Sequence, residues 1–303
     1  MKDIYIIGNG VIAKALAVAL VLNNKKVTIL RGSVDHQPGS IENIQVETDN
    51  GTLEAEVRVS TLSNYERLDG IILLTNKSFG NEELANKLKS KANNSPIVFL
   101  QNGLHVENIF IEQGYLDIYR CVLLATSQSI HKNKVKFRAV AESPVGVIKG
   151  SFAVLESLIT ELYTPLFSFK SEKDIQTVIW KKVISNCVFN SICPLLEIDN
   201  GVFHRNDSAL ELAKTVITEC LAVANENGIN LSMEDVLHNV LAISKMSDGQ
   251  NISTYQDILN KRETEIDTFN YAVARAAKAA LVPTTILLGK LIKIKSGLNT
   301  NSV

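Results

Sequence analysis

The chain has 303 residues, and its 31 basic side chains nearly balance its 32 acidic ones. This balance excludes the basic stripe of a nucleic-acid-binding protein, and no cluster of Lys and Arg beside an apolar segment points to a membrane surface. The four cysteines are scattered among apolar neighbours, which is typical of buried free thiols in a reducing compartment. We therefore expect a cytoplasmic protein with no structural disulfide, no metal site and no membrane-spanning segment.

The N-terminal part alternates apolar strands with helices, the pattern of a doubly wound parallel sheet. A strong turn signal, Asp49-Asn50-Gly51, predicts a hairpin between strands at 43–48 and 53–59. The strand-like runs from 119 to 148 predict an antiparallel extension of the same sheet. The remaining predicted elements of this part are strands at 3–7, 27–30, 71–75 and 96–101 and helices at 11–23 and 80–92.

Beyond about residue 170 the pattern changes to helices. They are predicted at 172–193, 207–228, 233–245, 254–260, 267–281 and 284–294. The fold class is therefore α/β, with a Rossmann-type sheet domain over 1–170 and an all-helical substrate domain over 171–303. The long apolar helices near the C-terminus leave room for a homodimer interface in the helical domain.

A glycine turn follows the first predicted strand and opens the first helix. Its sequence is Gly8-Asn9-Gly10-Val11-Ile12-Ala13, a G-x-G-x-x-A pattern. Gly8 permits the tight turn, Gly10 lets the backbone approach a pyrophosphate, and Ala13 allows the helix to pack closely on the strand. The turn predicts a dinucleotide-binding site.

Two basic residues follow later strands of the same sheet. Arg31 stands where an NAD enzyme would place an acidic residue for the ribose 2′-hydroxyl, so it favours the 2′-phosphate of NADPH. Lys77 follows the 71–75 strand, at the strand end where ligands bind in open α/β sheets. It is expected to meet the cofactor or the substrate.

A polar stripe runs along an otherwise apolar helix in the second domain. Lys182, Asn186 and Asn190 are spaced by four residues, so they share one face of the helix. A helix that is apolar on every side is normally buried, and polar groups on a buried surface are costly unless a polar group meets them. We interpret that group as a substrate.

Two further segments have the polar character of a site. Asn102-Gly103 follows the apolar run 96–101, beside the expected nicotinamide. Thr264-Glu265-Ile266-Asp267 has the form of a capping box, in which Thr264 would cap a helix and Asp267 would reach back. Glu265 would then lie in the first helical turn.

Taken together, these residues resemble the ketopantoate reductase (2-dehydropantoate 2-reductase) family, nearly from end to end. The glycine turn, Arg31, Lys77 and the L-x-N-G stretch ending at Gly103 match the family's N-terminal half. The helical half contains the family's W-[RK]-K-x-x-x-N-x-x-x-N helix and its S-x-x-Q-D and T-E-I-D blocks. The matching residues there are Trp180, Lys182, Asn186, Asn190, Asn200, Gly201, Ser253, Gln256, Asp257 and Thr264 to Asp267.

This resemblance implies hydride transfer from NADPH to the C2 ketone of ketopantoate, giving D-pantoate for pantothenate synthesis. Lys182 would be the general acid, because a lysine with a usual pKa of about 10.4 is protonated at neutral pH and can neutralise a developing alkoxide. Glu265 would accept from a substrate hydroxyl and help to position Lys182. The implied cofactor-binding residues are Gly8, Asn9, Gly10, Val11, Ile12, Ala13, Arg31, Lys77 and Asn102. The implied substrate-binding residues are Asn102, Asn186, Asn190, Asn200, Ser253 and Glu265.

The sequence also departs from the family pattern. The usual N-G-L-G-N reads Asn-Gly-Leu-His-Val here, with His105 and Val106 near the expected nicotinamide, and Thr254-Tyr255 replaces a Met-Leu pair. These changes leave the keto-acid substrate open. A reductase of another branched 2-keto acid and a non-catalytic NADPH-sensing protein are the alternatives, and the retained lysine argues against the second.

Overall fold

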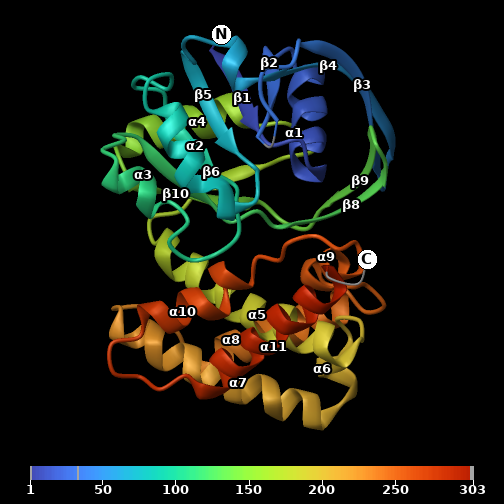
Figure 1. The fold of residues 1–303 in the computed structure, drawn as a ribbon, viewed down its shortest axis with the longest axis vertical. Coiled ribbons are helices and arrows are strands. Elements are labelled where there is room, and N and C mark those ends of the chain that lie inside the picture. The colour runs from blue at the N-terminus through green and yellow to red at the C-terminus, as the bar shows by residue number, and fades with distance from the viewer. Residues whose placement is uncertain (1, 33, 301–303) are drawn as a thin grey trace. The chain divides into compact units, whose positions relative to one another are not determined.

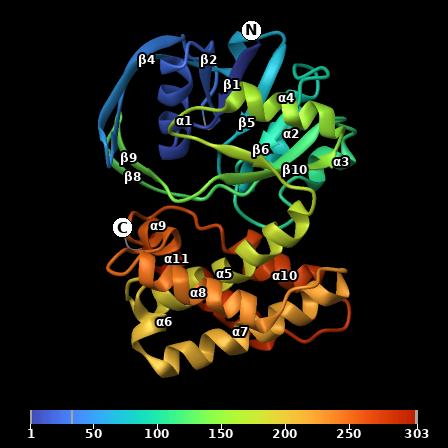
Figure 2. The same cartoon turned by 180° about the vertical axis from the view of Figure 1, so that it is seen from behind.

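The computed structural model describes residues 2–32 and 34–300, with side chains described to residue 298. The chain forms two compact units. Unit 1 comprises Met1–Gln101 and Val106–Ile175, and unit 2 comprises Asn102–His105 and Gln176–Val303. Figure 1 and Figure 2 show unit 1 as a sheet with helices on both of its faces, and unit 2 as helices alone.

Unit 1 is built on one sheet with the order β11-β10-β7-β6-β5-β1-β2-β4-β3-β9-β8. Its strands are β1 (Asp3–Ile7), β2 (Val27–Arg31), β3 (Ser40–Thr48), β4 (Gly51–Thr61), β5 (Gly70–Leu74), β6 (Ile97–Phe99), β7 (Ile118–Cys121), β8 (Ala125–His131), β9 (Lys134–Ala139), β10 (Ser143–Lys149) and β11 (Phe169–Ser171). The run from β7 through β6, β5, β1 and β2 to β4 is parallel. Because β1 lies between β2 and β5, the strand order reverses at its carboxyl end, where ligands bind in such sheets.

Helices cover the two faces of this sheet. α1 (Val11–Leu22) and α4 (Phe152–Leu162) pack on one face, and α2 (Asn81–Leu88) and α3 (Asn108–Glu112) pack on the other. β3, β4 and β9 also contact α1, so that eight of its twelve residues are buried. The helix is accordingly apolar almost all round. The predicted doubly wound sheet is confirmed.

The prediction of one antiparallel extension over 119–148 is wrong in part. β8 pairs with β9 and β10 pairs with β7 in antiparallel fashion, but β9 joins β3 in parallel and β7 joins β6 in parallel. The segment therefore extends the sheet on both sides: β9 and β8 form one edge, and β7 and β10 lie next to the edge strand β11 on the other. α4 was not predicted, although Ser151 caps it by accepting a hydrogen bond from Val154 N at 3.2 Å.

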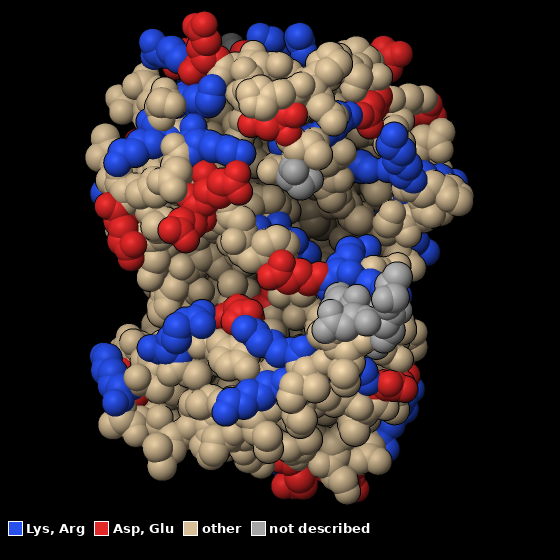
Figure 3. All heavy atoms as spheres, viewed as in Figure 1, with Lys and Arg blue, Asp and Glu red and all other residues tan. Residues whose placement is uncertain are grey.

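Unit 2 is helical, as predicted. Its helices are α5 (Ile175–Leu196), α6 (Val202–Arg205), α7 (Asp207–Glu226), α8 (Met233–Met246), α9 (Ser253–Leu259), α10 (Asn270–Ala276) and α11 (Pro283–Thr300). No helix in the described part of either unit is long and apolar enough to cross a membrane. On the face of the molecule seen in Figure 3, basic and acidic side chains are interspersed over unit 1.

The helix predicted at 267–281 is too long, since only Asn270–Ala276 is α-helical, and its capping box is wrong. A short 3-10 helix, η3 (Ile266–Thr268), is followed by α10, and Asp267 pairs with Lys293 at 2.7 Å instead of reaching back. The N-cap of η3 is Glu265, not Thr264, and it makes no side-chain capping bond. After Ala276 the backbone leaves the helix because the amides of Lys278, Ala279 and Ala280 donate to the carboxylate of Glu226 at 2.7–3.0 Å.

Candidate active site

The glycine turn lies between β1 and α1, at the point where the strand order reverses. Gly8 has φ +117°, and a Cβ there would lie 2.8 Å from the backbone nitrogen of Asn76, so only glycine fits. Gly10 is the N-cap of α1, where no side chain caps the helix and nothing lies within 4 Å of an added Cβ. The helix N-terminus thus offers its amides to an anion at an open position.

The surroundings of this turn fit a dinucleotide. Within the described residues, the buried oxygens Asn9 Oδ1, Asn76 Oδ1 and Ser78 Oγ have no hydrogen-bond partner. A buried polar atom without a partner is costly, and the hydroxyl and amide groups of a dinucleotide are suitable donors. Of these three residues, Asn9 belongs to the predicted turn from Gly8 to Ala13, and the backbone of Asn76 lies against Gly8.

Arg31 ends β2, and the amide of Gly8 donates to the carbonyl of the preceding Leu30 at 2.8 Å. The guanidinium of Arg31 is held in place by partners within unit 1. Arg31 Nη2 lies 2.7 Å from Glu42 Oε1, and Nη1 donates to Gln37 Oε1 at 3.0 Å. Glu42, on β3, is a partner that the sequence analysis did not find.

The loop that carries Lys77 is held by a buried amide network. Asn81 and Gln101 exchange two hydrogen bonds of 2.8 and 2.7 Å, and Gln101 Nε2 also donates to the carbonyl of Asn76 at 3.0 Å. Each of the two side chains is only 5% exposed. Because the network joins the ends of β5 and β6, it fixes the backbone on which Lys77 stands.

In unit 2, α5 carries the predicted polar stripe in a buried setting. Asn190 is 1% exposed, and Lys182 and Asn186 are partly buried. Asn190 Nδ2 donates to Asn186 Oδ1 at 3.3 Å, while Asn190 Oδ1 accepts from Ser253 Oγ at 3.2 Å and from Thr254 N at 3.3 Å. The structure thus joins three of the predicted substrate residues, Asn186, Asn190 and Ser253, in one chain of hydrogen bonds.

A second contact links the predicted residues Asn102 and Glu265. Leu104 N donates to Thr268 O at 2.9 Å, and Gly103 has φ +110° with Thr268 so close that a Cβ would overlap it. Thr268 in turn donates from N and Oγ1 to the carbonyl of Glu265. The Asn102 loop and the buried Glu265 are therefore held through one threonine, while the neighbouring His105 is exposed.

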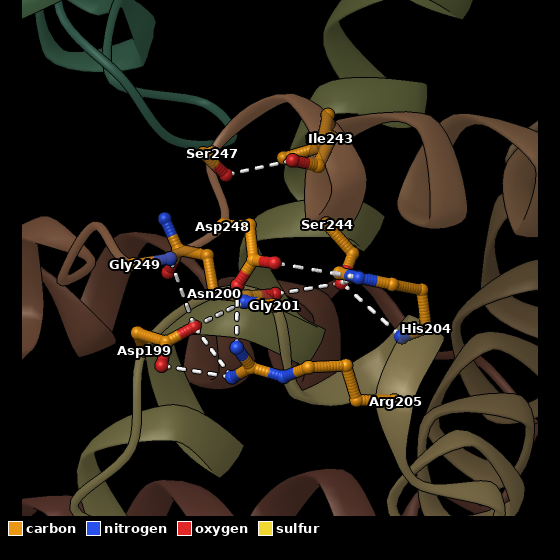
Figure 4. A network of polar contacts seen from close by, with 10 residues as sticks. All are labelled: Asp199, Asn200, Gly201, His204, Arg205, Ile243, Ser244, Ser247, Asp248 and Gly249. Atoms are coloured by element: carbon orange, nitrogen blue, oxygen red, sulfur yellow. Dashed lines mark hydrogen bonds and ion pairs between the residues drawn. The ribbon is translucent and has the colours of Figure 1, made fainter.

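Asn200 lies in a charged network between α5 and α8 (Figure 4). Its carbonyl accepts from Ser244 Oγ at 2.7 Å, and its Oδ1 is buried with no partner in the described residues. The adjacent Asp199 accepts two hydrogen bonds from Arg205 at 2.7 and 2.8 Å. That ion pair, helped by the amides of Gly201 and Gly249, lowers the pKa of Asp199 to about 2.

The two units hold different chemical groups. Unit 1 presents backbone amides and a guanidinium, which suit phosphate, and unit 2 presents an ammonium and carboxamides, which suit a carbonyl and a carboxylate. In the described residues no three His, Cys, Asp or Glu side chains are grouped to hold a metal ion, and the four cysteines are buried and unbridged.

The chain is similar to known proteins over nearly its whole length. Family models described as ketopantoate reductase PanE/ApbA and its C-terminal part match residues 4–149 and 174–292. A 2-dehydropantoate 2-reductase of Pyrococcus horikoshii is 25% identical over 305 residues, which covers 99% of both chains.

Solved structures share the fold. The ternary structure of a D-mandelate dehydrogenase with NADH and anilino(oxo)acetate has a TM-score of 0.85 at 22% identity, over 98% of this chain and 99% of that one. A dimeric ketopantoate reductase from Staphylococcus aureus has a TM-score of 0.82 at 17% identity, over 98% and 99%. At these identities the likeness is one of fold.

Proposed function

The chain belongs to the ketopantoate reductase family, and on that premise we propose that it reduces 2-dehydropantoate to D-pantoate with NADPH. The observation that carries this proposal is the stripe on α5, where Lys182 lies one turn from Asn186 and the buried Asn190 is bonded to Ser253. A partly buried ammonium beside carboxamides held by hydrogen bonds is suited to a substrate that becomes an alkoxide.

In the proposed mechanism, C2 of the keto acid would receive the hydride that NADPH supplies when bound. The C2 carbonyl electrons move to oxygen as the hydride arrives, and Lys182 Nζ stabilises the forming alkoxide and gives it a proton. Asn186, Asn190, Ser253 and Asn200 hold the substrate, with Asn102 beside it. Glu265 accepts from a substrate hydroxyl and helps to orient Lys182.

NADPH is proposed over NADH because Arg31 stands at the end of β2, where a guanidinium suits a 2′-phosphate. The turn from Gly8 to Ala13 would hold the pyrophosphate, and Lys77 would contact the cofactor. A cytoplasmic location, with a small-molecule partner and neither nucleic acid nor membrane, completes the proposal.

The proposal is tested by assaying the purified enzyme with NADPH on a panel of 2-keto acids. The panel contains ketopantoate, smaller branched acids and an aryl acid, benzoylformate. The aryl acid is included because the D-mandelate dehydrogenase has this fold. We expect the highest kcat/KM with ketopantoate. A tenfold preference for another acid would replace ketopantoate as the substrate, and no turnover of any acid would favour the sensor alternative.

We also propose a homodimer through α11. Leu287, Leu291 and Ile294 follow each other at helical spacing and are 55, 39 and 58% exposed, which is the seam spacing of paired helices. Light scattering is expected to show a dimer that Ile294→Glu converts to monomer. Leu116→Glu, at an equally exposed position of unit 1, is the control. A wild-type monomer would contradict the proposal.

A further inference from the structure

Among the described residues, Glu42 is the carboxylate that pairs with Arg31, the arginine that the proposed function assigns to the cofactor. Its Oε1 lies 2.7 Å from Arg31 Nη2, and the two side chains are only 13 and 23% exposed. Ser40 Oγ also donates to the same carboxylate oxygen at 3.5 Å. The pair is thus a partly buried contact rather than a loose surface one.

The backbone holds this carboxylate firmly. Glu42 lies inside the β3–β4 hairpin, paired with Val57, while β4 also pairs with β2 so that Arg31 faces Thr61. The charge is therefore carried by a strand of the same sheet, two strands away from Arg31. A further cation, Lys14 of α1, is close enough for Glu42 to act on it electrostatically and is itself 8% exposed.

The two forms of the cofactor meet this arrangement differently. A 2′-phosphate must share Arg31 with a carboxylate, and like charges in a partly desolvated place repel each other. A 2′-hydroxyl carries no charge and can donate a hydrogen bond to a carboxylate, as ribose does in NAD sites. The arginine favours the phosphate, and the carboxylate beside it opposes this preference.

We propose that Glu42 is a specificity-determining residue that weakens the preference of this site for the 2′-phosphate, so that the enzyme uses NADH as well as NADPH. This inference rests on the proposed dinucleotide site at Gly8 and Arg31, and it goes beyond it by assigning a role to a residue outside the glycine turn and β2. Arg31 attracts the 2′-phosphate, and the negative charge of Glu42 reduces the strength of that attraction.

The test measures binding of 2′,5′-ADP and 5′-ADP by calorimetry, which requires no turnover. Glu42→Gln keeps the length and the acceptor for Arg31 but removes the charge. We expect the affinity ratio of 2′,5′-ADP to 5′-ADP to rise at least tenfold. The matched control is Glu54→Gln, because Glu54 is a carboxylate of the same hairpin whose partners are Asn43 and Gln45. Its ratio is expected to stay within twofold of the wild type.

Glu42→Asp keeps the charge on a shorter side chain and should keep the low wild-type ratio. An unchanged ratio in Glu42→Gln, or an equal rise in Glu42→Asp, would overturn the proposal. Arg31→Ala separates this failure from that of the proposed function. If Arg31→Ala weakens 2′,5′-ADP no more than 5′-ADP, the 2′-phosphate assignment itself is wrong. If it weakens 2′,5′-ADP alone while Glu42→Gln changes nothing, only the role of Glu42 fails.

Discussion

Unit 1 and unit 2 hold their candidate ligand-binding groups in different ways. In unit 1 the glycine turn offers backbone groups, which close packing against Asn76 keeps free of a side chain at Gly8, while Gly10 faces open space. In unit 2 the key groups are side chains, and hydrogen bonds to other side chains keep them in place, as Asn190 does with Asn186 and Ser253. Substitutions in unit 1 should therefore change mainly cofactor affinity, and substitutions in unit 2 should change mainly kcat and the KM for the keto acid.

The largest effect is expected at the proposed proton donor. Lys182→Ala should lower kcat by roughly 10²- to 10⁴-fold, the usual contribution of a general acid, while the Kd for NADPH changes little. Lys181→Ala, at the preceding position of α5, is the matched control and should keep kcat within threefold of the wild type. If the two variants lost the same activity, the comparison between the units would fail at its central residue.

The glycine turn should respond in cofactor affinity. Gly8→Ala places a Cβ against the backbone of Asn76 at φ +117°, so it should lower both the thermal stability and NADPH binding. Gly10→Ala has open space for its Cβ and should leave the melting temperature nearly unchanged. It should still weaken NADPH by about tenfold, because the pyrophosphate must approach that backbone. Equal NADPH affinity in Gly10→Ala and wild type would contradict the assignment of the turn.

Asn190→Ala should affect folding and substrate binding together. It leaves Ser253 Oγ and the buried amide of Thr254 without their acceptor, which costs about 1–3 kcal/mol of unfolding free energy. The KM for the keto acid should rise more than the Kd for NADPH. Urea denaturation and steady-state kinetics measure the two parts. A rise in the NADPH Kd alone would show that this side chain serves the other half of the reaction.

The smallest effect is expected from the charged network around Asn200. The pKa of Asp199 is lowered from 3.8 to about 2 by Arg205, so the ionised form is favoured by folding. Its stabilisation is fully present above pH 4 and is lost as the pH falls towards 2. Asp199→Asn should cost about 1 kcal/mol at pH 7, because partial solvent contact screens the pair. Denaturation curves that differ as much at pH 2 as at pH 7 would contradict this origin.

The same contrast explains what the sequence could predict. Two parts of the site are local patterns that the sequence shows directly. Glycines between a predicted strand and a predicted helix reveal the turn from Gly8 to Ala13, and spacing by four residues reveals the stripe from Lys182 to Asn190. Glu42 could not be found in this way, because its pairing with Arg31 depends on how β2, β4 and β3 align. The contact by which Thr268 holds the Asn102 loop could not be predicted either, because it joins segments far apart in the sequence.

The wrong predictions also arose because local sequence patterns do not show which distant residues come into contact. The helical pattern over 267–281 and the capping form of Thr264 to Asp267 are valid local signals. Long-range partners override both of them. The carboxylate of Glu226 in α7 accepts hydrogen bonds from the amides of Lys278 to Ala280. Lys293 of α11 forms an ion pair with the carboxylate of Asp267. The antiparallel extension expected over 119–148 is right for the pairs β8–β9 and β7–β10, but β9 and β7 also join β3 and β6 in parallel.

Chemical rescue of Lys182→Ala tests most directly whether this side chain gives the proton. The variant is assayed with NADPH and ketopantoate in rising concentrations of methylammonium, and of tetramethylammonium at matched ionic strength. Both ions carry one positive charge, but only methylammonium has a proton to give. Our account predicts that methylammonium raises kcat at least tenfold, in proportion to its concentration, while tetramethylammonium has no effect. Equal rescue by both ions would contradict it, because a charge alone would then suffice.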